Sequence, residues 1–190
     1  PGTMLGEAGL AADLGMSRTP VRAALGRLQD EGWITVFPKR GALVQGLSEK
    51  TVRDLAEARL ILEGTAVQYC TTEQRAALAE QLERGIDQQK QALADRDLDC
   101  FIELTIAFHR SLVEAGDNLV MLELNDRIAD RQRFLLYSYG ETLLARCADI
   151  IAEHEELIAR LRADDIPGFS DVLRSHLVDT FGPGLRHLHV

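Results

Sequence analysis

The first 47 residues contain two short helical patterns followed by a change to strand-like spacing. Apolar residues repeat at helical intervals from Glu7 to Leu14, and Gly15 interrupts them. A second helix then starts, with Ser17 or Thr19 as its N-cap and an apolar face that extends to Leu28. From residue 33 the chain becomes aromatic and β-branched, which predicts strands at 33–37 and 42–44 around a turn at 38–41. The pattern predicts a helix-turn-helix followed by a β-hairpin.

The rest of the chain, residues 48–190, has helical periodicity throughout and no strand pattern. Short polar or glycine-containing breaks divide it into six segments. Segments of this length with short connections favour an antiparallel helical bundle, so the fold class is mainly α, with two domains at 1–47 and 48–190. The expected helices cover about 49–69, 72–94, 98–115, 118–138, 142–163 and 167–181.

Composition and charge separate the two domains further. The chain is 46% hydrophobic and 27% charged, and its longest apolar runs are too short to cross a membrane. Three cysteines without a CxxC spacing suggest neither a disulfide framework nor a zinc-binding cysteine cluster, and therefore a cytoplasmic protein. The net charge of −9 divides into +1 for residues 1–47 and −10 for the remainder. A weakly basic domain is thus joined to an acidic one.

Basic side chains cluster where a helix-turn-helix would meet DNA. Arg18 and Arg22 lie near the start of the second helix, and an arginine there can bind guanine O6 and N7 with two hydrogen bonds. Ser17 and Thr19 offer hydroxyls for phosphate contacts. The basic tip of the hairpin could reach a minor groove or a phosphate backbone beside the reading helix. Its residues are Lys39, Arg40 and Gly41. The alternative, a solvated face of a small helical domain, does not account for this combination.

The residues of the first domain resemble the winged helix-turn-helix of GntR-family transcription regulators. The most specific part is Ser17-Arg18-Thr19-Pro20-Val21-Arg22, supported by Leu14-Gly15, Glu31-Gly32 and Gly41. The resemblance implies that Ser17, Arg18, Thr19 and Arg22 contact bases and phosphates of an operator, and that Gly41 approaches the minor groove. It also implies that the family's first helix would precede Pro1, so that the winged domain lacks it here.

Three histidines interrupt apolar stripes in three different helices of the second domain. His109, His154 and His176 each have apolar residues at helical offsets, so all three are expected to point into the bundle. Each alone could be a hydrogen-bonded core histidine. Together they favour a shared divalent cation, because a buried imidazole needs a partner and three histidines with one open position suit zinc.

The second domain resembles the FCD effector-binding domain of the FadR branch of GntR regulators. The resemblance rests on Arg59-Leu60-Ile61-Leu62-Glu63, Phe108-His109, Glu153-His154-Glu155-Glu156 and Ser175-His176-Leu177. It implies a Zn²⁺ or Ni²⁺ site formed by one aspartate and the three histidines, beside a small carboxylate or sugar acid. The aspartate would lie four residues before the first histidine, where this chain has Thr105. The site could therefore bind metal weakly, complete its shell with water or effector, or bind none.

Two arginines share faces with apolar residues and are candidate effector-binding groups. Arg59 has Glu63 one turn further along its helix, and Arg131 lies among Leu124, Ile128 and Leu135. An inward guanidinium needs a partner, which could be an internal carboxylate or the carboxylate of an effector. Arg59 matches an arginine common in the ligand pocket of the family. Thr105 is expected beside the same ligand.

These observations predict a homodimeric transcription regulator that binds a pseudo-palindromic DNA operator and responds to a small organic acid, without enzymatic activity. Two alternatives remain at this stage. One is a metal-dependent enzyme that uses the three histidines, although no inward carboxylate is placed as a general base. The other is a metal-free regulator that binds a larger apolar ligand. Six helices after the wing favour the VanR-like subgroup.

Overall fold

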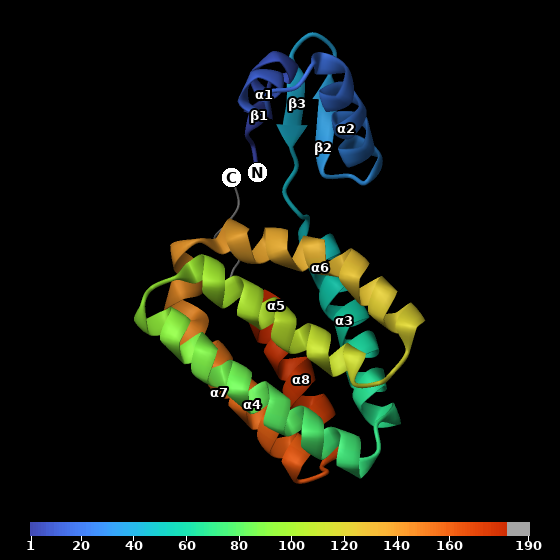
Figure 1. Cartoon of the computed structure of the whole chain (residues 1–190), viewed down its shortest axis with the longest axis vertical. Helices are drawn as coiled ribbons and strands as arrows, with labels where there is room; N and C mark the ends of the chain where they lie inside the picture. Colours follow the sequence, from blue (N-terminus) through green and yellow to red (C-terminus); the bar gives the residue numbers. More distant parts are fainter. Residues whose placement is uncertain (182–190) are drawn as a thin grey trace. The chain divides into compact units, whose positions relative to one another are not determined.

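The structure is a computed structural model that describes residues 1–181 of the chain (Figure 1). The chain divides into two compact units, with the boundary between Ser48 and Glu49. No helix in the described part is long and apolar enough to span a membrane.

The N-terminal unit is a winged helix-turn-helix. Helices α1 (Glu7–Asp13) and α2 (Arg18–Asp30) are joined by a turn in which Gly15 has a φ of 62°. Three short antiparallel strands form a sheet in the order β1-β3-β2, where β1 is Met4–Leu5, β2 is Ile34–Phe37 and β3 is Gly41–Val44. Where β2 pairs with β3, Ile34 lies opposite Val44, and Phe37 lies opposite Gly41.

The two helices and the sheet of this unit share one small core. Ala11 of α1, Val21 and Leu25 of α2, and Ile34 and Ala42 of the sheet are buried together. Leu28, expected on the same apolar face, is more than a third exposed. The core therefore uses one narrow stripe of α2 and leaves the rest of the helix surface to solvent.

Within the described residues, the C-terminal unit is an all-helical bundle. Its helices are α3 (Glu49–Tyr69), α4 (Thr72–Ala94), α5 (Leu98–Glu114), α6 (Leu119–Tyr139), α7 (Glu141–Arg162) and α8 (Ile166–Phe181). Helix α4 starts with a capping box in which Thr71 and Gln74 satisfy each other's backbone amides, and Asn118 caps α6. Helix α4 packs against α5 and α7, while α3 packs against α5, α6 and α8. In Figure 1, α4 and α7 lie side by side along their length.

The predicted fold class is confirmed: a winged helix-turn-helix is followed by six helices within residues 49–181. The sequence pattern missed one element. Strand β1 has two residues, too few to show an alternating pattern, and it forms because Met4 and Leu5 pair with Leu43 and Ala42 of β3.

Candidate functional site

The residues expected to contact DNA lie on the first turns of α2 and at the tip of the wing. Ser17 is the N-cap of α2, and Arg18, Thr19 and Arg22 are exposed on the helix that follows. Lys39 and Arg40 are exposed in the turn between β2 and β3. Ser17 makes no side-chain hydrogen bond to the start of the helix, so its hydroxyl is not used as a cap.

Backbone geometry explains the glycine at the tip of the wing, where β3 begins. Gly41 has a φ of 111°, and a Cβ built there would lie 2.4 Å from the carbonyl oxygen of Leu5. Only glycine fits this conformation and this approach of β1 to β3. Gly41 is therefore required by the fold of the wing itself, and its approach to a minor groove remains a prediction.

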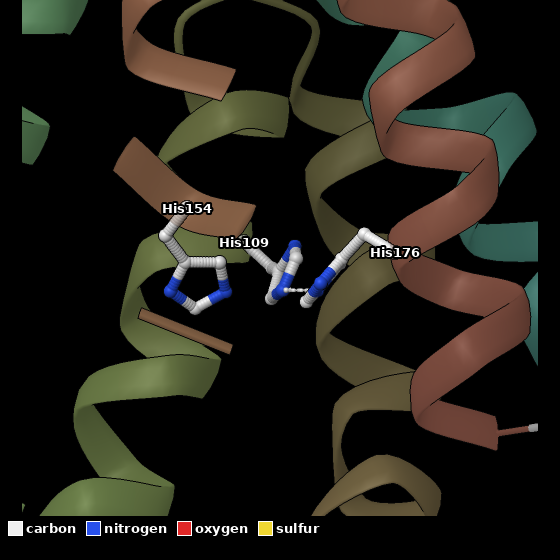
Figure 2. A group of neighbouring side chains, drawn as sticks. All are labelled: His109, His154 and His176. Carbon is white, nitrogen blue, oxygen red and sulfur yellow. Dashed lines mark hydrogen bonds between the residues drawn. The ribbon is translucent and has the colours of Figure 1, made fainter. Parts of the chain in front are cut away.

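The three histidines predicted to point inward do so, and their rings converge between three helices (Figure 2). His109 is on α5, His154 on α7 and His176 on α8. One nitrogen from each ring lies within 4.8 Å of the others. They are the single group of three or more possible metal ligands within the described residues.

Each histidine is held by an oxygen acceptor on its Nδ1 side. His109 Nδ1 lies 2.8 Å from Glu63 Oε2, His154 Nδ1 lies 2.9 Å from Gln89 Oε1, and His176 Nδ1 lies 2.6 Å from Glu153 Oε2. Phe108 stacks on the His154 ring, with centroids 4.0 Å apart. Carboxylate and carbonyl oxygens that orient a histidine in this way are typical partners of metal-ligating imidazoles.

This arrangement determines which ring nitrogens carry hydrogen. An Nδ1 that donates to an oxygen leaves Nε2 as the lone-pair nitrogen in a neutral imidazole. His109 Nε2 and His176 Nε2 face each other at 3.1 Å, and His154 Nε2 is buried without a hydrogen-bond partner within residues 1–181. Two lone pairs at this distance need a proton or a cation between them. The donor set therefore fits a divalent ion bound by three Nε2 atoms.

The electrostatics of the cluster favour the neutral form of two of the ligands, His109 and His154. Burial is the largest cause that lowers the pKa of His109 and of His154 well below the ordinary histidine value, and nearby Arg59 and His176 act in the same direction. Burial also raises the pKa of Glu63, while the Arg59 guanidinium favours its charged form. Neutral imidazoles are the form that binds metal.

The position expected for a fourth ligand carries no acid. Thr105 lies one turn before His109 on α5 and is buried, and its hydroxyl has no hydrogen-bond partner in the described structure. Two acids earlier in the same stretch of chain have other partners. Asp97 caps α5, and Glu103 pairs with Arg133. The histidine cluster thus has a hydroxyl, and no carboxylate, at this position.

The two candidate effector arginines differ in their surroundings. Arg59 is fully buried, and its Nε donates to Glu63 Oε1 at 2.8 Å. The internal ion pair is therefore present, and Glu63 connects Arg59 to His109. Arg131 is half-buried on α6. The structure brings Arg59 to the histidine cluster through Glu63.

Sequence reasoning assigned no role in the site to three residues. Gln89, Glu153 and Phe108 hold or cover the histidine rings. Gln89 could have been noticed, because it is a polar residue three positions after the buried Ile86 on the apolar stripe of α4. Glu153 adjoins a predicted ligand, but sequence alone does not show that it contacts His176, 23 residues further along.

Comparison with known proteins defines the class. The FCD domain matches residues 54–179, and the gntR family of bacterial regulatory proteins matches residues 1–44. A transcriptional regulator of the HTH type from Streptomyces ambofaciens, located in an unstable DNA locus, is 31% identical over 95% of this chain and 75% of its own. The gluconate operon transcriptional repressor of Bacillus subtilis is 29% identical over 86% of this chain and 69% of its own.

A solved structure shares the fold of the helical unit. It is described as the metal-free FCD domain of the transcriptional regulator TM0439, and it aligns with a TM-score of 0.58 at 22% identity over 71% of this chain and 91% of that chain. The chain belongs to the GntR family of transcription regulators. It combines the DNA-binding domain of this family with an FCD effector-binding domain.

Proposed function

We propose that this regulator binds a divalent metal ion, Zn²⁺ or Ni²⁺, through His109, His154 and His176, and that a small organic acid binds beside it and changes operator affinity. The observation that carries the proposal is the convergence of three Nε2 atoms whose rings are fixed from the Nδ1 side. The description of a related FCD domain as metal-free also supports it, since it implies a metal-containing form.

The chain's own residues would have distinct roles in this function. The three histidines hold the ion, and Glu63, Gln89 and Glu153 orient them. A bound ion would supply positive charge and an open coordination position for a carboxylate. Arg59, Arg131 and Thr105 are the residues proposed to meet the effector, and the hydroxyl of Thr105 can donate one hydrogen bond to it.

Metal content and a ligand screen test this proposal together. Protein purified without chelator and without a histidine tag should contain about one equivalent of metal, and small carboxylates should raise its thermal midpoint only when metal is present. Absence of stoichiometric metal would overturn the metal site. Stabilisation by apolar ligands in chelator would instead identify a metal-free regulator, and turnover of a screened compound would identify an enzyme.

On the DNA side, we propose that Ser17, Arg18, Thr19, Arg22, Lys39, Arg40 and Gly41 form the contact surface for a pseudo-palindromic operator. The exposed basic groups at the start of α2 and at the wing tip support it. Arg22→Ala should weaken operator binding strongly in a gel-shift titration while the circular dichroism spectrum stays unchanged. Unchanged affinity would remove Arg22 from the surface.

We further propose a cytoplasmic homodimer of the VanR-like subgroup, assembled through α3 and α6. Five large apolar side chains on α3 and on the first two turns of α6, which packs against it, are exposed, with Leu119 at 78% of its accessible surface. In the same half of α6, the polar Asn125 is buried. A helix with exposed apolar and buried polar positions favours burial of its apolar side chains against a second copy of the chain. The five side chains are Ile61, Tyr69, Leu119, Val120 and Leu124.

A further inference from the structure

The proposed DNA-reading arginine of α2 is already engaged by an acid of α1. Arg22 Nε donates to Glu7 Oε1 at 3.1 Å, and Arg22 Nη2 donates to Glu7 Oε2 at 2.8 Å. These two parallel bonds form the planar fork that fits a carboxylate to a guanidinium. The pair joins the two helices of the helix-turn-helix across 15 residues of sequence.

The pairing leaves one side of the guanidinium available. Within residues 1–181, Arg22 Nη1 donates to no protein acceptor, and the side chain is 70% exposed whereas that of Glu7 is 29% exposed. Glu7 therefore occupies the Nε edge of the guanidinium and the Nη1 side faces solvent. A guanidinium fixed on one edge keeps a defined plane for a second planar partner.

The charge of Glu7 has a cost for DNA binding. Its hydrogen bond with Arg22 is the largest cause that holds the pKa of Glu7 below its ordinary value, so the carboxylate is ionised at neutral pH. A carboxylate beside the reading helix repels the phosphates of any DNA sequence. An exposed ion pair contributes little to fold stability in return. The geometry is thus better suited to selecting a sequence than to increasing overall affinity.

We propose that Glu7 is a positioning residue for sequence recognition, which holds the guanidinium of Arg22 in the plane that meets a base or phosphate. The inference rests on the proposed role of Arg22 in operator binding. It assigns to α1, which carries none of the proposed DNA contacts, a part in specificity.

The test uses the full chain and a duplex selected by the wild-type protein from a random-sequence library, with a scrambled duplex for comparison. The dissociation constants of both duplexes are measured over a range of salt concentrations for Glu7→Gln and Glu7→Ala. We expect the ratio of selected to scrambled affinity to fall about tenfold, within the range for one two-bond arginine–base contact. Affinity for the scrambled duplex should stay equal or rise.

Asp13→Asn is the matched control, because it removes the same charge from the exposed end of α1. It should change both affinities equally and leave the ratio unaltered. An unchanged ratio in Glu7→Gln, or a rise in affinity for the selected duplex, would overturn the positioning role. In an Arg22→Ala background, Glu7→Gln should leave the ratio unchanged, and a tenfold fall there would also contradict the proposal.

The two proposals fail in different ways. Unchanged binding in Arg22→Ala alone would overturn the role of Arg22 itself. Weakened binding in Arg22→Ala combined with an unaltered ratio in Glu7→Gln would overturn only the positioning by Glu7. A thermal midpoint measured for each variant separates loss of recognition from loss of fold, because positioning predicts a changed ratio at an unchanged midpoint.

Discussion

His154 is the residue whose environment points most directly to a ligand. Its ring is fully buried, stacked on Phe108 and bonded through Nδ1 to Gln89, while Nε2 has no hydrogen-bond partner in the described structure. A buried nitrogen left unsatisfied costs about 1–3 kcal/mol. The surrounding residues nevertheless hold the ring in one orientation, which is expected if that nitrogen binds an ion.

Gln89 should therefore control metal affinity without touching the metal. We expect Gln89→Ala to weaken Zn²⁺ binding about 10–100-fold, because the His154 ring loses the acceptor that fixes its tautomer. Competition with a chromophoric chelator measures the change. Gln91→Ala is the control, since Gln91 is exposed on the same helix and bonds to Asp95. Equal affinities in the two variants would contradict the orienting role of Gln89.

Thr105 allows a gain-of-function test at the missing fourth position. Thr105→Asp adds a carboxylate one turn before His109, so it should raise Zn²⁺ affinity by at least about tenfold and make the thermal midpoint strongly metal-dependent. Without metal the buried charge should lower that midpoint. Thr105→Val is the control. This substitution removes an unsatisfied buried hydroxyl, so it should raise the free energy of unfolding by about 1–3 kcal/mol.

Equal Zn²⁺ affinity in wild type and in Thr105→Asp, measured on folded protein, would show that residue 105 does not face the metal position.

At this scale, helical periodicity in the sequence was sufficient to predict that three histidines point inward. It could not identify their partners, because periodicity gives the face of a helix and not the residue that this face meets. Gln89 lies 65 residues from His154 in the chain, and Glu63 lies 46 residues from His109. For Arg59 the sequence left an ion pair and an effector contact open, and the structure contains the ion pair with Glu63.

Among the elements, the wing shows how a strand can depend on one backbone conformation. The predicted hairpin at 33–37 and 42–44 corresponds to β2 and β3, because β-branched residues and a basic turn mark it clearly in the sequence. Strand β1 depends instead on the close approach of Leu5 to Gly41. A two-residue pairing of this kind arises from tertiary contact and leaves no periodic trace in the sequence.

Gly41→Ala should destabilise the wing. The substitution puts a Cβ where φ is 111° and where the Leu5 carbonyl oxygen would lie 2.4 Å away, so we expect a loss of about 1–3 kcal/mol in the free energy of unfolding of this unit. Chemical denaturation followed by Trp33 fluorescence measures it. Gly46→Ala is the control, because its Cβ would make an ordinary contact at 3.5 Å with Pro1. Equal stability in both variants would contradict the steric argument.

For the whole molecule, the separation of charge follows the separation of tasks. The net charge of −9 combines a value of +1 for residues 1–47 with −10 for the rest of the chain. The basic groups of the first part are presented on α2 and the wing tip, whereas many acids of the helical unit form surface ion pairs such as Lys90–Glu155 and Arg110–Asp126. Like charge repels the helical unit from DNA and favours contact through the winged unit.

The proposed dimer can be tested at the exposed apolar face of α3 and α6. Combining Leu119→Glu with Leu124→Glu adds two charges to side chains that are 78% and 46% exposed, so each folded subunit should remain stable. Buried against an identical surface, the same charges would be desolvated and would repel each other. We therefore expect sedimentation to change from dimer to monomer, with loss of about 10²-fold or more in affinity for a paired operator site.

The double variant Ala77→Glu with Glu80→Gln is the control: it introduces a glutamate on the exposed surface of α4 while the net charge stays unchanged, and it should sediment as wild type. A double variant that remains dimeric would place the interface elsewhere. A wild-type protein that sediments as a monomer, yet binds a paired operator site about 10²-fold more tightly than a half-site, would show that dimerisation is not needed for this affinity. Loss of paired-site affinity with half-site affinity retained would show that α3 and α6 act only by joining two DNA-binding units, because a single winged unit keeps all of its own contacts.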